Sequence, residues 1–239
     1  MKIDIHTHVL PGVDDGARDW DECLQMLIKS VESGVTDLVA TPHCIPWEKG
    51  APVEDIIKLC QEAESKLKKE HGMTLNVYPG HEVYYVPGIV ESLKSGQVLS
   101  LAGTRYVLVE FKPASPYQEL FRAAREFCDA GYIPIYAHVE RYRCLRDMNK
   151  MQELKGMGVL FQMNVKTFQG GIFDKESRRA KRYLKKEKID FLASDMHDVL
   201  EDSFLTSKNL QWIFKKLRIE YRKKLLHDNG QKILDDAKR

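Results

Sequence analysis

The chain opens with the run Ile3-Asp4-Ile5-His6-Thr7-His8 and, shortly after it, Asp14-Asp15-Gly16. In the first run, two isoleucines alternate with polar residues at the period of a β-strand, which places both histidines on the same side of the backbone. Two imidazoles that lie two residues apart at the end of a strand can both reach one divalent ion. They could equally be two surface histidines, so their meaning depends on whether the rest of the chain supplies further ligands.

Length and composition are those of an ordinary globular protein. The 239 residues, 43% hydrophobic and 30% charged, predict one α/β domain spanning residues 1–239. A net charge of +2 does not indicate a nucleic-acid partner. Apolar runs stay well short of the roughly 20 residues of a membrane span, and the N-terminus lacks a signal-peptide pattern, so we expect no membrane insertion. Five scattered cysteines without CxxC pairs favour reduced thiols in the cytoplasm.

Predicted strands and helices alternate along the whole chain. After the opening strand, hydrophobic patterns predict strands at 35–41, 74–80, 105–110, 132–137, 159–164 and 189–194. Helices are predicted at 19–33, 53–71, 87–94, 116–130, 147–156, 174–187, 203–217 and 219–237. Such alternation predicts a parallel sheet, and seven strand-then-helix units favour a barrel over an open sheet. A doubly wound sheet also fits, but the dinucleotide-binding GxGxxG loop is missing from the sequence.

Histidine or carboxylate residues end six of the seven predicted strands. They are His6 and His8, His43, Glu82, Glu110, His138, and Asp195 with His197. Any one of them could be a hydrogen-bonded core histidine or a helix cap. Because the carboxyl ends of parallel strands converge on one face, we expect all eight side chains to meet in a single cleft.

The number and type of these residues predict more than one metal ion. A tetrahedral zinc needs four ligands, so eight or nine ligands predict two or three ions. Imidazole mixed with carboxylate suits zinc, manganese or iron better than calcium. Ions about 3.5–4 Å apart can activate water and neutralise charge on a phosphoryl oxygen, which favours phosphoester hydrolysis.

The motifs that contain these residues resemble a known superfamily. His6-Thr7-His8, Thr41-Pro42-His43 and Ser194-Asp195-Met196-His197 are similar to motifs of the polymerase and histidinol phosphatase (PHP) superfamily. A closer resemblance, over nearly the whole chain, is to the bacterial capsule-type tyrosine phosphatases. It rests on Val13-Asp14-Asp15-Gly16, Glu82-Val83-Tyr84-Tyr85, Val109-Glu110-Phe111, Ala137-His138-Val139-Glu140-Arg141-Tyr142 and Ala193-Ser194-Asp195-Met196-His197.

This resemblance implies a distorted seven-stranded (β/α)7 barrel of the PHP type and a cluster of two or three divalent ions. Manganese usually supports the family, and zinc, iron or cobalt are alternatives. The implied reaction is dephosphorylation of the phosphotyrosine tail of a membrane-associated tyrosine kinase that regulates capsule or exopolysaccharide synthesis. The implied ligands are His6, His8, Asp15, His43, Glu82, Glu110, His138, Asp195 and His197. Asp14 is the alternative to Asp15, and His81, which neighbours Glu82, is predicted to be structural.

Substrate contacts are less clearly marked in the sequence. Arg141 lies three residues after a ligand and could hold two phosphoryl oxygens as a catalytic residue. Tyr85, Tyr142 and Arg143 are further candidates, with Tyr84 and Phe111 as possible walls of an aromatic pocket, although ordinary packing would also explain these aromatic residues. The family often has a second arginine after Asp-Met-His, but residues 198–202 are acidic and contain none. Arg143, Arg146 or Lys112 could replace it.

Cysteine catalysis and other functions fit the sequence less well. A cysteine phosphatase needs an arginine six residues after its nucleophile, and the five cysteines are followed at that distance by Lys29, Gly50, Lys66, Pro134 and Lys150. A histidinol-phosphate phosphatase of the same superfamily and an inactive metal-binding scaffold stay open as alternatives. A nuclease is less expected because no nucleic-acid module accompanies the predicted barrel. The basic runs at 178–182 and 215–218 could attract an acidic peptide or could be solvated helix faces.

Overall fold

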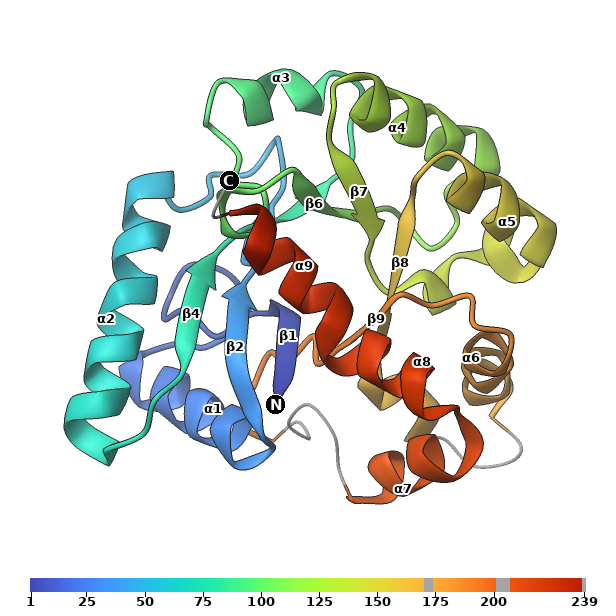
Figure 1. Ribbon diagram of the computed structural model, residues 1–239. Helices are drawn as coiled ribbons and strands as arrows, with labels where there is room; N and C mark the ends of the chain where they lie inside the picture. The colour runs from blue at the N-terminus through green and yellow to red at the C-terminus, as the bar shows by residue number, and fades with distance from the viewer. Residues whose placement is uncertain (170–173, 201–206, 238–239) are drawn as a thin grey trace.

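Parallel strands form two adjoining sheets surrounded by helices (Figure 1). The computed structural model describes residues 1–169, 174–200 and 207–237. One sheet has the order β1-β2-β4, with β1 (Lys2–Thr7), β2 (Val35–Ala40) and β4 (Asn76–Pro79). The other has the order β3-β5-β6-β7-β8-β9, with β3 (His43–Cys44), β5 (Glu82–Tyr84), β6 (Tyr106–Glu110), β7 (Ile133–Tyr136), β8 (Leu160–Asn164) and β9 (Phe191–Ala193).

The two sheets are joined along two edges. On one side β2 runs through Pro42 into β3, and the Glu82 amide donates a hydrogen bond to the Pro42 carbonyl at 3.1 Å. On the other side β9 meets β1, because the Asp195 amide donates to the His6 carbonyl at 2.9 Å. The His8 amide in turn donates to the Met196 carbonyl at 3.0 Å. The sheets therefore form one curled wall.

The predicted parallel α/β arrangement is confirmed, but the described residues contain nine strands rather than seven. The extra strands are β3 and β5, short pieces that follow β2 and β4 after a break. Pro42 cannot donate a ladder hydrogen bond, which accounts for the first break. The second break is at Gly80, where a Cβ would lie 3.0 Å from Val39 Cγ1. The backbone lies so close to Val39 there that the position has no room for a side chain.

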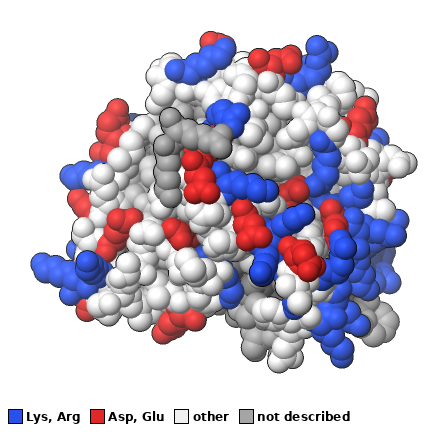
Figure 2. Space-filling view, viewed as in Figure 1, with Lys and Arg blue, Asp and Glu red and all other residues white. Residues whose placement is uncertain are grey.

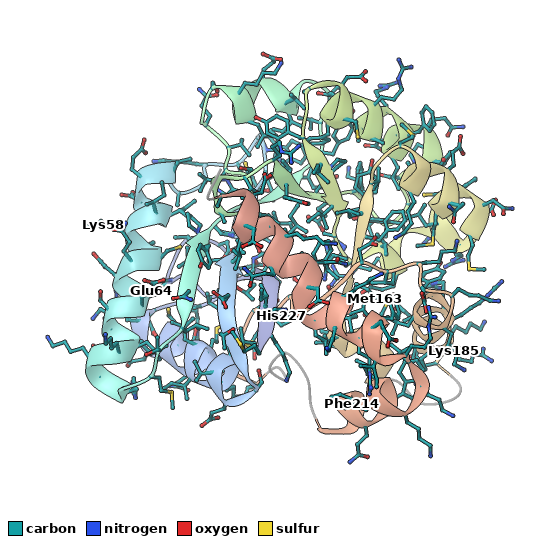
Figure 3. All side chains as sticks on the ribbon, in the orientation of Figure 1. Lys58, Glu64, Met163, Lys185, Phe214 and His227 are labelled. Atoms are coloured by element: carbon teal, nitrogen blue, oxygen red, sulfur yellow. The ribbon has the colours of Figure 1, made fainter. Side chains whose placement is uncertain are left out.

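Seven helices cover the outer face of the wall, close to their predicted ranges. They are α1 (Trp20–Glu32), α2 (Val53–His71), α3 (Ile89–Lys94), α4 (Tyr117–Asp129), α5 (Met148–Gly156), α6 (Lys175–Lys185) and α7 (Ser207–Lys216). The first four residues of the helix predicted at 203–217 lie outside the described residues. Apolar stripes bury these helices against the strands. Figure 3 shows the contrast between Met163 on β8, which is fully buried, and Lys58 and Lys185 on outer helix faces.

A small apolar cluster fills the inside of the curl and is covered at the amino ends of the strands. Its members are Ile3, Ile5, Val39, Leu101, Leu108, Ile135, Ala137, Phe191, Ala193, Ile233 and Leu234. The covering segment is α8 (Ile219–Lys223), a π-helical turn at Lys224–Asp228 and α9 (Asn229–Asp236), where one unbroken helix was predicted. Gly230 lets α9 approach closely, since a Cβ there would lie 2.8 Å from Ile3 Cβ. The opposite end of the curl remains available for polar residues.

Within the described ranges, the structure has no helix that is both long and apolar enough to span a membrane.

Candidate metal centre

The polar cluster lies directly above the inner apolar cluster, at the carboxyl ends of the strands. On β6, Leu108 belongs to the apolar cluster, and Glu110 follows two residues later on the same face. Ala193 and Asp195 repeat this spacing at the end of β9. On both strands, an apolar residue of the inner cluster is therefore followed two residues later, on the same face, by a ligand-type residue.

On β1 an irregularity brings His6 and His8 to the same place. The register between β1 and β2 shifts between Asp4 and Thr7, and such bulges change the direction of side chains. The Nε2 atoms of the two histidines lie 3.2 Å apart, and both residues are buried. The predicted proximity of the two imidazoles is therefore present.

Nitrogen and oxygen atoms of His6, His8, Glu82 and Asp195 form a first group, mutually within 4.8 Å and buried. His6 Nε2 lies 3.2 Å from Glu82 Oε2 and 3.3 Å from Asp195 Oδ1. His8 Nε2 lies 3.4 Å from the same Glu82 oxygen. Two imidazoles and two carboxylates thus surround one small space, a donor set that suits a transition-metal ion.

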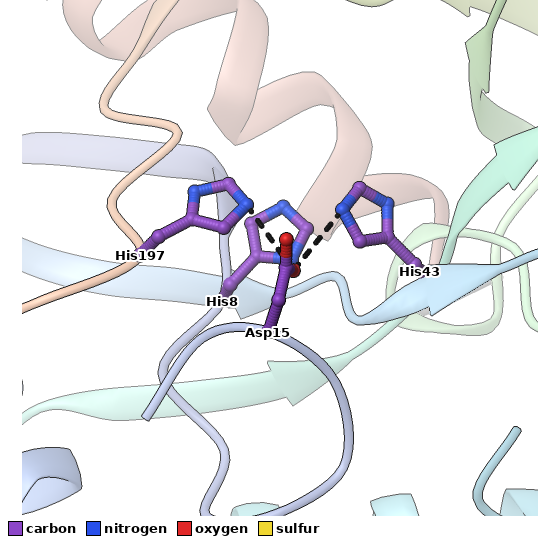
Figure 4. Close-up of side chains that lie close together, drawn as sticks. All are labelled: His8, Asp15, His43 and His197. Carbon is purple, nitrogen blue, oxygen red and sulfur yellow. Dashed lines mark ion pairs between the residues drawn. The ribbon is translucent and has the colours of Figure 1, made fainter. Parts of the chain in front are cut away.

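Asp15 lies among three imidazoles in a second, more open group (Figure 4). Its Oδ1 atom lies 3.3 Å from His43 Nε2 and 3.6 Å from His197 Nε2. The His8 ring completes the group and stacks on the His197 ring with centroids 4.0 Å apart. His8 therefore belongs to both groups.

Glu82 is a carboxylate that two of the three groups share. In a third group with His43 and Glu110, its Oε2 lies 3.0 Å from His43 Nδ1. Its other oxygen, Oε1, lies 2.9 Å from His138 Nε2, which is also 3.3 Å from Glu110 Oε1. The structure thus brings all nine sequence-predicted ligand residues into one continuous cluster.

Outer contacts orient the two histidines of β1. The Nδ1 atom of His8 donates to Asp14 Oδ2 at 2.7 Å, which leaves Nε2 as the nitrogen that faces the cluster. On His6, Nδ1 lies 3.3 Å from Gln162 Oε1 in the same relation. Partners of this kind fix the tautomer of metal-binding histidines. They also distinguish Asp14, which supports His8 from outside, from Asp15, which belongs to the cluster.

Backbone geometry at the cluster is unusual. His138 and Asp195 have φ values of 32° and 51°, in the left-handed region that side chains other than glycine rarely adopt. The His138 amide donates to Gln162 Oε1 at 2.6 Å, so the same amide side chain that contacts His6 holds this conformation. Strained residues of this type concentrate at functional sites.

Charge inside the cluster is strongly coupled. Burial would raise the pKa of Glu82, but the charge of His6, a hydrogen bond from His138 and the nearby His43 ring hold that pKa well below its usual range. Burial would likewise lower the pKa of His8, but the hydrogen bond to Asp14 and the charge of Glu82 raise it to about 10. The carboxylate of Glu82 therefore stays charged although it is buried among imidazoles.

Several buried atoms of the cluster fit a metal better than a hydrogen-bond network. Within the described residues, Glu82 Oε2, His43 Nδ1 and His138 Nδ1 are buried and have no hydrogen-bond partner. Glu82 Oε2 and His43 Nδ1 lie 3.0 Å apart without hydrogen-bond geometry. Unsatisfied buried polar atoms are costly, and coordination of a cation would satisfy them.

A cavity of 600 Å³ opens beside the second group, between Asp15, His197 and the Gly16–Arg18 turn. Arg141 is at the rim of the cluster: its side chain is 39% exposed, and its NH2 group donates to Asp195 Oδ2 at 3.1 Å. A second cation near Asp195, Lys166, follows β8 and was not identified from the sequence. Its Nζ atom lies 3.9 Å from the same Asp195 oxygen.

The aromatic residues expected at the substrate occupy other positions. Tyr85 and Tyr142 are 2% and 1% exposed and pack against Phe111 in the outer core, so neither lines an opening. The Tyr85 hydroxyl donates to Glu126 Oε2 at 2.9 Å instead. The substrate contacts predicted for Tyr85 and Tyr142 stay predictions, at side chains that the structure buries. Arg143, Arg146 and Lys112 are exposed, and residues 201 and 202 of the acidic run lie outside the described residues.

An exposed tryptophan packs against a half-buried tyrosine near the cluster. The Trp47 ring lies edge-on to the Tyr84 ring with centroids 5.1 Å apart, and Trp47 is 62% exposed. Tyr84 pairs with Glu110 in the β5–β6 register, which places the pair next to the cluster. Tyr84, which the sequence analysis named as a possible wall of an aromatic pocket, shares a strand face with Glu82.

The remaining histidines lie outside the cluster. His81 is buried and accepts a hydrogen bond from the Leu99 amide at 2.9 Å, a structural role, and burial lowers its pKa to about 4. His71 is exposed at the end of α2, and His227, labelled in Figure 3, is half-buried beside Asp228.

Comparison with known proteins agrees with this geometry. The family model described as capsular polysaccharide synthesis, CpsB/CapC, matches residues 2–235. Tyrosine-protein phosphatase CpsB of Streptococcus pneumoniae is 30% identical over 240 residues, covering 98% of each chain.

Two solved structures are also similar. One is a crystal structure from a study of YwqE from Bacillus subtilis and CpsB from S. pneumoniae, which are described there as metal-dependent tyrosine phosphatases. It superposes with a TM-score of 0.84 at 27% identity, over 99% of this chain and 92% of the other. The histidinol phosphate phosphatase of Lactococcus lactis shares the fold, with a TM-score of 0.54 at 15% identity over 90% and 93% of the two chains. The chain therefore belongs to the CpsB/CapC family of capsular polysaccharide synthesis proteins.

Proposed function

We propose that this protein is a metal-dependent tyrosine phosphatase that hydrolyses phosphotyrosine in a protein substrate. The observation that carries the proposal is the carboxylate of Glu82, which two of the three groups of potential ligands share, beside an open cavity. Membership of the CpsB/CapC family and the likeness to metal-dependent tyrosine phosphatases support the same reaction.

The cluster would hold two or three divalent ions, with manganese as our choice. His6, His8, Glu82 and Asp195 would hold one ion, and His8, Asp15, His43 and His197 another. His43, Glu82 and Glu110, with His138 beside them, offer a third position. Bound ions would supply water activation and neutralise charge on the phosphoryl oxygens. If β2 with β3, and β4 with β5, are each counted as one interrupted strand, the described strands number seven. On that count we propose that the fold is a distorted seven-stranded barrel.

Arg141 is the group that we expect to bind the phosphoryl oxygens directly. Its planar guanidinium can donate to two of them at once, and its partial exposure at the rim leaves it accessible. The carboxylate of Asp195 holds it in place before substrate arrives. Tyrosine leaves as a phenolate with a pKa near 10, so its departure needs little help from an acid.

The phenyl ring would lie against Trp47 and Tyr84. Aromatic rings pack favourably edge-to-face, and the exposed indole beside Glu110 offers such a surface. Trp47→Ala should therefore lower kcat/KM for phosphotyrosine several-fold and leave that for phosphoserine unchanged, with Trp47→Phe close to wild type. An equal loss on both substrates would refute a ring contact.

The proposed substrate is the tyrosine-rich tail of a membrane-associated kinase that controls capsule or exopolysaccharide synthesis. Figure 2 shows Lys and Arg side chains gathered toward α6 and α8, where Lys175, Arg178, Arg182 and Lys185 are exposed on α6. Such a surface would attract an acidic tail. The five free cysteines are consistent with the cytoplasmic location that we propose.

The test is hydrolysis of p-nitrophenyl phosphate after chelation and after return of manganese, zinc, iron or cobalt. Activity should vanish with chelator and return with metal, and His6→Ala and Arg141→Ala should reduce it strongly. Parallel assays with a phosphotyrosine peptide and with histidinol phosphate identify the substrate class. Preference for histidinol phosphate would overturn the proposed substrate, and no recovery with any metal would indicate an inactive metal-binding scaffold.

A further inference from the structure

We propose that Lys166 is a second phosphoryl-binding cation of this site, acting together with Arg141. The proposal rests on the proposed function for the identity of the ligand, a phosphate monoester. Its evidence is separate and comes from the position of the ammonium group beside Asp195.

Three consecutive strands place their following residues side by side. Arg141 ends the 3₁₀ turn after β7 (Val139–Arg141), and Lys166 lies in the turn after β8 (Val165–Gln169). Asp195 follows β9, and β7, β8 and β9 are neighbours in the sheet. Two cations and one cluster carboxylate thus come from adjacent points on the same edge of the wall.

The carboxylate of Asp195 divides its two oxygens between the imidazoles and the cations. Oδ1 lies 3.3 Å from His6 Nε2 and 3.6 Å from His8 Nε2. Oδ2 accepts hydrogen bonds from Arg141 NH2 at 3.1 Å and from the side-chain amide of Asn164. Lys166 Nζ lies 3.9 Å from Oδ2 and donates to the Asp195 carbonyl at 3.3 Å. An anion that touches the cluster from this side would meet both cations.

Exposure separates the two cations from the ligands. The side chain of Lys166 is 35% exposed and that of Arg141 is 39% exposed, whereas that of Asp195 is 3% exposed. The cations therefore form a boundary between the buried cluster and solvent. A long hydrogen bond to a carbonyl is easily exchanged, and a lysine carries three donors on a flexible stem. One of these donors can thus reach a phosphoryl oxygen while the others keep the partners that Lys166 has in the site.

A purely structural role is the competing explanation: Lys166 would hold Asp195 in place for the metal. The two roles differ in what they affect. Loss of a phosphate contact weakens anion binding and leaves the metal in place, whereas loss of a positioning contact weakens metal binding itself.

The experiment compares Lys166→Met, which keeps the length of the side chain, with Lys166→Arg, which keeps its charge. Lys58→Met is the matched control, because it removes one lysine charge from the outer face of α2 (Figure 3). Each metal-loaded protein is titrated with inorganic phosphate by calorimetry, and its metal content is measured. Steady-state kinetics with p-nitrophenyl phosphate are recorded in parallel.

We expect Lys166→Met to retain its metal and to bind inorganic phosphate about tenfold or more weakly, as for loss of a hydrogen bond to a charged group. Lys166→Arg should recover most of that affinity, and Lys58→Met should match wild type. Unchanged phosphate affinity in Lys166→Met, or loss of metal from it, would overturn the proposal. A wild-type protein that binds phosphate through Lys166 but hydrolyses no monoester would contradict the proposed function alone.

Discussion

Adjacent aspartates, Asp14 and Asp15, have separate tasks in this site. Asp14 accepts a hydrogen bond from His8 Nδ1 and others from the Gly16 and His43 amides, whereas Asp15 faces His43 and His197. Asp14→Asn should weaken metal affinity about 10- to 100-fold without changing the number of ions bound at saturation. Asp15→Asn removes a donor and should lower that number.

Metal titration with mass-spectrometric counting of bound ions distinguishes these outcomes. Asp21→Asn, on the exposed first turn of α1, serves as the control. If both cluster variants bound metal as the control does, the division of roles between the two aspartates would be wrong.

The cysteines provide a second test at this scale. Cys23 and Cys60 are buried, and burial raises the pKa of each thiol to about 12, so neither is a thiolate at neutral pH. A variant without cysteine should keep kcat/KM with p-nitrophenyl phosphate within about threefold of wild type, and iodoacetamide should not inhibit the native protein. A folded but inactive cysteine-free variant would contradict the metal-based reaction.

Among the elements, the turn that carries Asp14 and Asp15 depends on a single glycine. A Cβ on Gly16 would lie 2.0 Å from the His8 carbonyl oxygen, and this is backbone that cannot easily move, because the Ala17 amide donates to the same oxygen at 3.0 Å. Gly16→Ala should therefore displace the turn, lower the melting temperature and weaken metal binding. Gly50→Ala, where a Cβ would meet open space, is the control. Equal melting temperatures for the two variants would show that the close approach has little effect.

Sequence patterns predicted the helices well and the strands less completely. The helix predicted at 53–71 is α2, Val53–His71, because its apolar residues keep one face over five turns and Gly72 ends it at φ 67°. By contrast, β3 has two residues and β5 has three, too few for any periodicity to appear. The π-helical turn before α9 was also missed, since it keeps the spacing of its apolar residues close to that of an α-helix.

For the site, the sequence likewise predicted the ligand-type residues better than the residues around them. Ligands at strand ends follow from topology, which is why eight of the residues could be named before their distances were known, whereas Asp15 was named from the family resemblance. Lys166 and Trp47 could not be placed, because a cation or an indole in a loop carries no periodic signal and its neighbours are set by tertiary contacts. The burial of Tyr85 could not be predicted, because the partner of its hydroxyl, Glu126, lies on α4, far away in the sequence.

For the molecule as a whole, the cluster takes ligands from both sheets and so links them. Metal bound to the folded chain alone should stabilise it by about 2.7 kcal/mol at 100 times the dissociation constant. This corresponds to a rise in Tm of roughly 5–10 °C for a chain of this size. Calorimetric scans with and without manganese would measure it. Glu82→Gln, which alters the shared carboxylate, should abolish most of the rise, and a wild-type Tm indifferent to metal would contradict a link between the sheets.

The seam between β9 and β1 also has a consequence for biosynthesis. His6 and His8 leave the ribosome long before β9, but the hydrogen bonds from Asp195 and His8 that join β1 to the segment after β9 form only once that segment is made. A nascent chain that stops before β9 lacks Asp195 and His197, and the two four-residue groups of the cluster are incomplete. We therefore expect metal to bind late in synthesis and truncated chains to lack the full set of ligands.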